Sequence, residues 1–214
     1  MKLYGFAPTR SLRVVWALRE LDVAFDFVTV DPAKGELRSP EFLALNPAGK
    51  LPVLVDGDLV LTESVAIVLY LAAKHPEKGF VPTGLRERAE LDRWLLFTVT
   101  ELEQPLWRIA RNTAVYPPEK RVAADIPIAR QDFLDMAAVM EIHMDGRAFL
   151  VGESATVADF IAAYTLDMAT LVPSRENEAP LLARFPRLRD FMERMYARPK
   201  APPRLAEAFA SLRP

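Results

Sequence analysis

Two neighbouring stretches decide the fold: Asn46-Pro47-Ala48-Gly49-Lys50-Leu51-Pro52-Val53-Leu54 and, after a hairpin, Leu61-Thr62-Glu63-Ser64-Val65-Ala66-Ile67. The first predicts a turn that enters a strand through Pro52, and the second predicts a helix that begins at Glu63-Ser64. Free backbone N–H groups and the helix dipole favour an anion at such a helix start. The Glu63 carboxylate can take an amine. This corner is therefore predicted to hold the α-amino acid end of a ligand.

The rest of the N-terminal part alternates strands with helices. Residues 2–5 and 25–30 are predicted as strands, residues 10–21 and 64–74 as helices, and residues 40–45 as a short helix. Asp56-Gly57-Asp58 is a tight-turn signal between strands at 53–55 and 59–61. The order βαβαββα is that of a thioredoxin-like α/β domain with a mixed sheet.

A linker and an all-α domain follow. Pro76, Gly79, Pro82 and Gly84 indicate the linker. Beyond it only helical patterns are found, at about 86–112, 118–145, 157–171, 186–198 and 204–212. Thr156-Val157-Ala158-Asp159 is similar to a capping box, so Thr156 and Asp159 are expected to support folding. We predict a domain at 1–77, a linker at 78–86 and an all-helical domain at 87–214.

Composition argues against several functional classes. The net charge is −2 and is evenly spread, so we expect no nucleic-acid or membrane partner. The absence of cysteine excludes disulfides, thiolate metal sites and a cysteine nucleophile. His75 and His143 are the only histidines, and no metal site is expected. We see no signal peptide and no apolar run of about 20 residues, so a cytoplasmic protein is expected.

The motifs resemble those of a known family. NPAGKLPVL and LTESVAI are similar to the glutathione-binding half of the glutathione transferase superfamily. LYGFAPTRSLRVVWALREL resembles its first strand, catalytic turn and first helix, and GESATVADFIAA resembles a buried helix start in its second domain. The resemblance covers essentially the whole chain and places it in a bacterial branch without a catalytic cysteine.

The resemblance implies roles for five residues around the proline loop. Pro52 is expected to follow a cis peptide bond, with the Leu51 backbone facing the cysteinyl part of glutathione. Lys50 is expected to pair with the glycyl carboxylate, although an exposed loop lysine would look the same. Ser64 is expected to contact the γ-glutamyl carboxylate and Glu63 the α-amine, and Ser64 is also a natural helix cap.

Thr9 and Ser11 compete for the catalytic position. In the family, a hydroxyl or thiol in the turn after the first strand hydrogen-bonds the glutathione sulfur. We expect Thr9 to matter more, because its hydroxyl should project toward the proline loop, whereas Ser11 can bond its own backbone. Arg10 stands where the cysteine-using branch has its nucleophile and cannot replace it. Tyr4 is a weaker candidate, since it should lie within a strand.

The end of the first long helix in the second domain implies an electrophile pocket by the same resemblance, formed by Trp107, Arg108, Arg111, Asn112 and Tyr116. Arg108 and Arg111 would attract an acidic co-substrate or simply form a solvated face. Trp107 is equally consistent with a core position.

The sequence thus predicts a glutathione transferase, with glutathione as co-substrate and a small electrophile as second substrate, acting in detoxification. A homodimer is expected by resemblance, with Phe42 and the helix from Arg86 near its interface. One alternative is a glutathione-dependent isomerase or dehalogenase. The other is a non-catalytic glutathione-binding or protein-interaction module, because a fold alone does not fix function.

Overall fold

The computed structural model describes residues 1–172 and 179–212. The chain divides into two compact units. The first comprises residues 1–81 together with the C-terminal segment from residue 198, and the second comprises residues 82–197. The sequence did not predict that the C-terminal segment belongs to the first unit, since the helical domain was expected to run to residue 214.

A four-stranded sheet forms the centre of the first unit. Its strands are β1 (Lys2–Gly5), β2 (Asp26–Thr29), β3 (Val53–Asp56) and β4 (Leu59–Thr62), in the order β2-β1-β3-β4. β1 is parallel to β2 and antiparallel to β3, and β3 is antiparallel to β4. With the helices at Ser11–Glu20, Pro40–Leu45 and Ser64–Lys74, the predicted βαβαββα order of residues 2–74 is confirmed.

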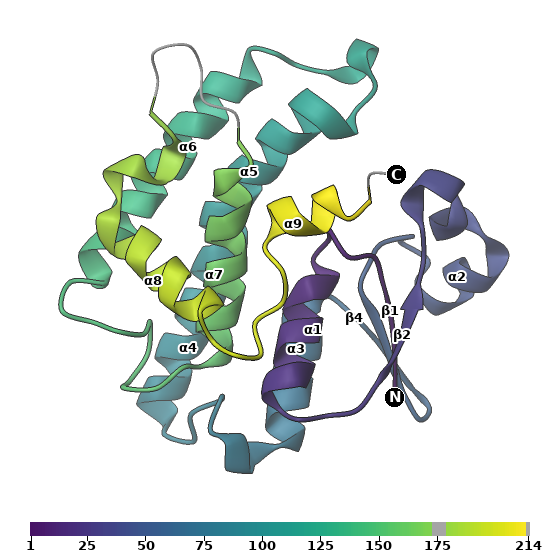
Figure 1. Cartoon of the computed structure of the whole chain (residues 1–214), viewed down its shortest axis with the longest axis horizontal. Helices are drawn as coiled ribbons and strands as arrows, with labels where there is room; N and C mark the ends of the chain where they lie inside the picture. The colour runs from purple at the N-terminus through teal and green to yellow at the C-terminus, as the bar shows by residue number, and fades with distance from the viewer. Residues whose placement is uncertain (173–178, 213–214) are drawn as a thin grey trace. The chain divides into compact units, whose positions relative to one another are not determined.

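Helices cover both faces of this sheet (Figure 1). α1 (Ser11–Glu20) and α3 (Ser64–Lys74) lie on one face, and the short α2 (Pro40–Leu45) lies on the other. Side chains alternate along a strand, so Val53 packs with Val30 and Phe42 on the α2 side while Leu54 points the opposite way. Phe42, which we expected near a dimer interface, is only 4% exposed and belongs to this core.

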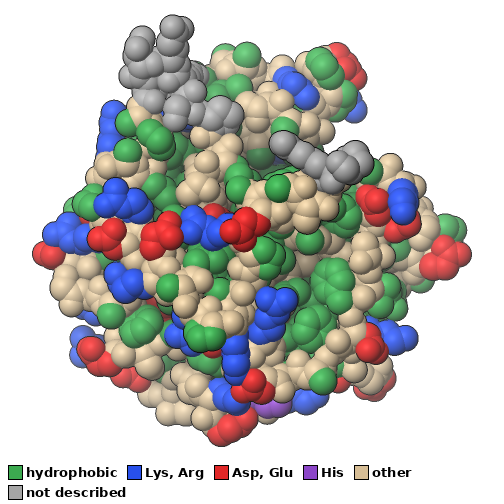
Figure 2. All heavy atoms as spheres, viewed as in Figure 1, with side chains coloured by type: hydrophobic (Ala, Val, Ile, Leu, Met, Phe, Trp, Pro, Cys, Tyr) green, Lys and Arg blue, Asp and Glu red, His purple; other side chains and the backbone are tan. Residues whose placement is uncertain are grey.

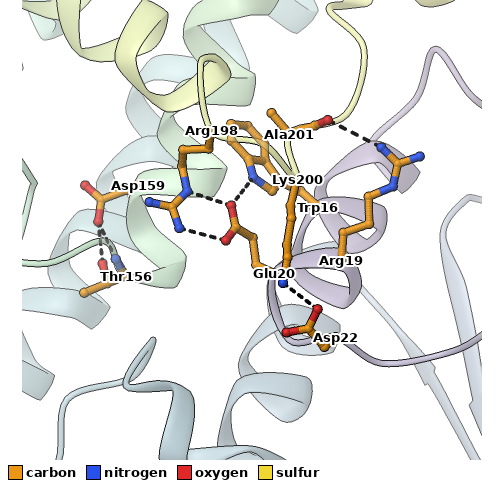
Figure 3. Close-up of polar contacts among 9 residues, drawn as sticks. All are labelled: Trp16, Arg19, Glu20, Asp22, Thr156, Asp159, Arg198, Lys200 and Ala201. Carbon is orange, nitrogen blue, oxygen red and sulfur yellow. Dashed lines mark hydrogen bonds and ion pairs between the residues drawn. The ribbon is translucent and has the colours of Figure 1, made fainter.

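Ion pairs and hydrogen bonds connect the C-terminal segment to the end of α1 (Figure 3). Arg198 donates to both carboxylate oxygens of Glu20, at 2.6 and 2.7 Å, and the Trp16 indole N–H donates to the same carboxylate at 3.2 Å. Glu20 is buried, so these bonds compensate its lost hydration. Lys200 adds an ion pair with Asp22. The segment ends in α9 (Leu205–Ala210).

Helices connected by turns and loops form the second unit, whose described residues contain no strand. Its main helices are α4 (Leu85–Phe97), α5 (Glu103–Ala110), α6 (Asp125–His143), α7 (Val157–Thr170) and α8 (Pro186–Tyr196). π-helical segments at Thr98–Leu102 and Arg111–Val115 interrupt the first predicted helix. The second was predicted to start at Pro118 and does not: Pro118–Lys120 forms one 3-10 turn, and α6 begins at Asp125. On the face shown in Figure 2, positive and negative side chains are mixed around α8.

The buried helix α7 begins at the predicted capping box, which is present. Asp159 is fully buried and accepts hydrogen bonds from the Thr156 N–H, the Thr156 hydroxyl and the Leu150 N–H, at 2.7 to 2.8 Å. Figure 3 shows the two bonds from Thr156. Burial raises the pKa of the Asp159 carboxyl to about 6, against the opposing effect of these bonds. Asp159 thus joins the helix start to the preceding loop.

We predict that Asp159→Ala lowers the free energy of unfolding by about 3 kcal/mol, because three buried donors lose their acceptor. Urea unfolding followed by circular dichroism measures this loss. Glu153→Ala, which removes an exposed acid from the loop before α7, is the matched control and should change stability by less than about 0.5 kcal/mol. Normal stability combined with lost activity would assign Asp159 to the chemistry instead.

Candidate functional site

The sheet register brings three segments of the first unit to one edge. Tyr4 pairs with Val53, and Val53 pairs with Thr62. β1 and β4 end at this edge, and β3 begins there. The turn after Gly5, the loop before Val53 and the helix start after Thr62 therefore meet. These segments carry seven residues singled out from the sequence: Thr9, Ser11, Lys50, Leu51, Pro52, Glu63 and Ser64.

The loop before β3 is organised by Asn46. This side chain is 7% exposed, its amide donates to the Lys50 carbonyl at 2.8 Å, and its Oδ1 accepts from the Ala48 N–H at 3.1 Å. The loop ends in a cis peptide bond between Leu51 and Pro52, as the resemblance implied. Sequence analysis missed Asn46, although an Asn-Pro pair at a turn is a known signal for such side-chain bonds.

The Arg38 side chain lies against the same loop, which also carries the cation Lys50. Gly49 has φ of +61°, and a Cβ placed there would come within 2.8 Å of a guanidinium nitrogen of Arg38 and 2.9 Å of the Leu37 carbonyl oxygen. The loop thus needs glycine at this position for both conformation and space. Arg38 and Lys50 are both exposed, and no pattern in the sequence pointed to Arg38.

The start of α3 combines an unusual backbone with a buried hydroxyl. Glu63 is exposed and has φ of +64° and ψ of 112°, a conformation that costs a non-glycine residue about 1–3 kcal/mol. Ser64 is 5% exposed, and its Oγ accepts from the Arg13 guanidinium at 3.3 Å. The expectation that Ser64 caps the helix is wrong: Glu63 is the N-cap residue, and no side-chain cap bond is made there. The first turn of α3 contains no acidic residue, and Glu63 at the N-cap makes no side-chain bond to its backbone N–H groups.

The turn after β1 holds the two competing hydroxyls in contact. Thr9 Oγ1 donates to the Phe6 carbonyl at 2.7 Å and lies 2.9 Å from Ser11 Oγ. Ser11 Oγ accepts from the Phe6 N–H at 3.3 Å, and the Ser11 N–H donates to Thr9 Oγ1 at 3.2 Å. Because the one proton of Thr9 is directed to Phe6, Ser11 is the donor between the two hydroxyls.

The two hydroxyls differ in access. Ser11 is 0% exposed and packed so closely on β1 that a Cβ on Gly5 would lie 2.8 Å from it. Thr9 is half-buried. The Thr9 hydroxyl was expected to project toward the proline loop, but it bonds within its own turn.

Four residues singled out for the electrophile lie in the second unit, at the end of α5 and just beyond it. Trp107, Arg108, Arg111 and Tyr116 are all half-buried, as is Asn112, the fifth residue expected in this pocket. Arg108 pairs with both carboxylate oxygens of Asp125 and with Asp132, and these hydrogen bonds hold the pKa of its guanidinium above the ordinary value. Asn112 donates to Asp125 at 3.2 Å. Arg108 thus serves an internal network.

Between residues 1–172 and 179–212, His, Asp and Glu side chains form no group of three suited to a metal ion. Within the same ranges, each helix is either too short or too polar to cross a lipid bilayer.

Comparison with known protein families gives two matches. Residues 1–73 match the model described as glutathione S-transferase, N-terminal domain, and residues 104–199 match glutathione S-transferase, C-terminal domain. Among curated relatives, glutathione S-transferase 1 of Dianthus caryophyllus is 34% identical over 190 residues, covering 85% of this chain and 83% of that protein. Glutathione S-transferase GST-4.5 of Xanthomonas campestris pv. campestris is 32% identical over 170 residues, covering 79% and 82%.

Solved structures agree with these matches. A glutathione S-transferase from Xylella fastidiosa has a TM-score of 0.80 and 29% identity, with 98% of this chain and 97% of that chain covered. A theta class glutathione S-transferase from Xanthomonas axonopodis pv. citri, solved with glutathione bound, has a TM-score of 0.80 and 27% identity, with 94% of each chain covered.

We predict that Asn46→Ala lowers the free energy of unfolding by about 1–3 kcal/mol, because the Ala48 N–H and the Lys50 carbonyl both lose a buried partner. Denaturant unfolding measures the loss. Asn46→Asp is the companion variant: it keeps the acceptor for Ala48 but sets a charged oxygen against the Lys50 carbonyl, so it should destabilise the protein as well. A stability equal to wild type in both variants would show that the loop does not depend on this side chain.

Proposed function

Because the chain belongs to the glutathione S-transferase family, we propose that it binds glutathione at the sheet edge formed by the turn after β1, the loop before β3 and the start of α3. The observation that carries this proposal is the shared register of Tyr4, Val53 and Thr62, which gathers the three segments. The unusual backbone of Glu63 supports it, since conformations of this kind concentrate at functional sites.

Glutathione would lie along this edge with its charged ends on opposite segments. The uncapped start of α3 and the Ser64 hydroxyl suit the γ-glutamyl carboxylate, because backbone N–H groups and the helix dipole favour an anion there. The exposed Glu63 carboxylate suits the α-amine. The exposed cations Lys50 and Arg38 suit the glycyl carboxylate, and the Leu51 backbone would face the cysteinyl part.

The enzyme would activate the thiol chiefly through Thr9. A free thiol has a pKa of about 8.5, and lowering it by about two units requires about 2.7 kcal/mol. One hydrogen bond to the thiolate supplies about 1.5–3 kcal/mol, and the N-terminus of α1 adds about 0.3–1 kcal/mol. Thr9 would turn its proton from the Phe6 carbonyl to the sulfur while Ser11, buried behind it, continues to donate to Thr9 Oγ1.

The thiolate would then attack a small electrophile. The sulfur forms a bond to carbon as a halide leaves, or it adds to an activated double bond whose other carbon takes a proton. Trp107, Arg111 and Tyr116 are proposed to contact this substrate, and Arg108 to hold the surrounding helix end through Asp125 and Asp132. Positioning both reactants supplies much of the rate gain.

The family also suggests a setting for this activity. We propose a homodimer that acts on electrophiles in the cytoplasm as a detoxifying enzyme. Leu85 and Leu96 of α4 are 87% and 62% exposed and would be covered by a partner subunit. Phe42, also expected near that interface, is 4% exposed and packs in the core of the first unit.

We predict that Thr9→Val raises the pKa of bound glutathione by about 1–2 units, while Ser11→Ala changes it little. Ultraviolet titration of the thiolate in each binary complex measures this pKa. Thr9→Ser, which keeps the hydroxyl, is the matched control and should retain a lowered value. A raised thiol pKa in Ser11→Ala but not in Thr9→Val would transfer the role to Ser11. An unchanged thiol pKa in both variants would leave activation to backbone N–H groups and the helix dipole.

We also predict that Ser64→Ala weakens glutathione binding about tenfold, equivalent to about 1.4 kcal/mol, because the ligand carboxylate loses a donor. Isothermal titration calorimetry measures the affinity. Ser211→Ala, which removes an exposed hydroxyl elsewhere in the first unit, should bind as wild type does. Unchanged affinity in a folded Ser64→Ala protein would remove Ser64 from the site.

A further inference from the structure

Arg108 and Arg111 lie one turn apart in the second unit but differ in their partners. Arg108 pairs with Asp125 and Asp132. It also lines a hollow of about 270 Å³ whose other charged lining residues are all acidic: Glu101, Asp132 and Asp135. An anion would be repelled there. Arg108 is therefore unsuited to bind an anionic ligand.

Arg111 has no carboxylate partner among the described residues. Its Nε is buried without a hydrogen-bond partner in that part of the chain, and its Nη1 makes only a long bond of 3.4 Å to the Tyr116 hydroxyl. The nearest acid is already used, because Asp125 accepts from Arg108 and from Asn112. Asp125 attracts the half-buried Arg111 only through space, and the buried Nε lacks a hydrogen-bond acceptor, so this group is suited to take an anionic ligand.

Tyr116 contacts two arginines, Arg111 through its side chain and Arg121 through its backbone carbonyl. The Arg111 guanidinium lies 5.7 Å from the centre of the Tyr116 ring, and Arg121 Nε donates to the Tyr116 carbonyl at 2.7 Å. In the described residues Arg121 likewise has no carboxylate partner. The chain between them is fixed by the Val122 N–H, which donates to Asn112 Oδ1 at 3.0 Å. Arg111 thus lies by the Tyr116 ring, and Arg121 is bonded to the backbone of the same residue.

The charges of this cluster do not cancel. It contains three guanidinium groups, of Arg108, Arg111 and Arg121, and two carboxylates, of Asp125 and Asp132, which leaves one positive charge. The neighbouring Glu119 and Lys120 offset each other. Both carboxylates form their ion pairs with Arg108, and Asp125 attracts Arg111 only through space, so Arg111 and Arg121 are left without an ion pair of their own in the described part of the chain.

We propose that Arg111 and Arg121, with the Tyr116 hydroxyl, bind a carboxylate or similar anionic group on the electrophile, so that the preferred second substrates are anionic. This inference rests on the proposed transferase function and gives its substrate class. A guanidinium can bind a carboxylate through two parallel N–H bonds, and Tyr116 supplies a third donor.

The test compares two electrophiles that share a reacting centre, 4-chloro-3-nitrobenzoate and 4-chloro-3-nitrobenzamide, each corrected for its uncatalysed rate with glutathione. We expect Arg111→Ala to lower kcat/KM for the benzoate at least about tenfold more than for the benzamide. Arg121→Ala, at an exposed position, should act in the same direction. Arg93→Ala, which removes an exposed arginine of α4 paired with Glu90, is the control and should change neither value.

A second measurement needs no turnover: calorimetric binding of the two glutathione conjugates that these reactions produce. Wild type should bind the benzoate conjugate at least about tenfold more tightly than the benzamide conjugate, and Arg111→Ala should lose this preference. The anion site would be overturned if Arg111→Ala lost affinity equally for both conjugates. It would also be overturned if both arginine variants kept the wild-type preference for the benzoate conjugate. If wild type prefers the anionic conjugate but turns over neither electrophile, the transferase proposal fails and the anion site stands.

Discussion

The pairing of β3 with both β1 and β4 is the constraint on which the rest of the first unit depends. Tyr4, Val53 and Thr62 lie side by side across three strands, so a turn, a proline loop and a helix start meet at one edge. A shift of one residue in either ladder would reverse which side chains of β3 face each side. Val53 would leave the core with Phe42, and Leu54 would leave the opposite face. The burial of these side chains fixes the strand register, and the register in turn brings the three segments of the site together.

Within this frame, the site depends on polar groups that the fold has already arranged. Asn46 fixes the loop before β3, Arg13 holds the Ser64 hydroxyl, and Ser11 holds Thr9. Each of the three supporting side chains is buried and bonded to its neighbour. Groups preorganised in this way lose little entropy when an anion or thiolate binds.

Much of the fold could be predicted from the sequence, because its signals are local. Pro52, the Asp56-Gly57-Asp58 turn and the Thr156–Asp159 box fix strand and helix ends through their own geometry, and these elements lie where we expected them. The start of α6 was missed because an apolar helical pattern alone does not show that Pro118 to Ala124 stays outside the helix. The π-helical segments at Thr98 and Arg111 leave no periodic signal of their own.

The supporting contacts of the site could not be predicted, because they join residues far apart in the chain. Nothing local indicates that Arg13 meets Ser64 or that Arg38 lies against Gly49. The same holds for the return of the C-terminal segment, where Arg198 meets Glu20. Likewise Arg108 and Arg111 look alike in the sequence, and only the positions of Asp125 and Asp132 separate them.

The central claim is that glutathione occupies the edge defined by the loop before β3 and the start of α3. Hydrogen exchange of backbone amides, measured with and without saturating glutathione, tests it directly. The account predicts that exchange slows at least about tenfold at Lys50, Leu51 and residues 64–66, since a ligand stabilises the segments that it contacts. Unchanged exchange at both segments, with slowing confined to other parts of the chain, would contradict it.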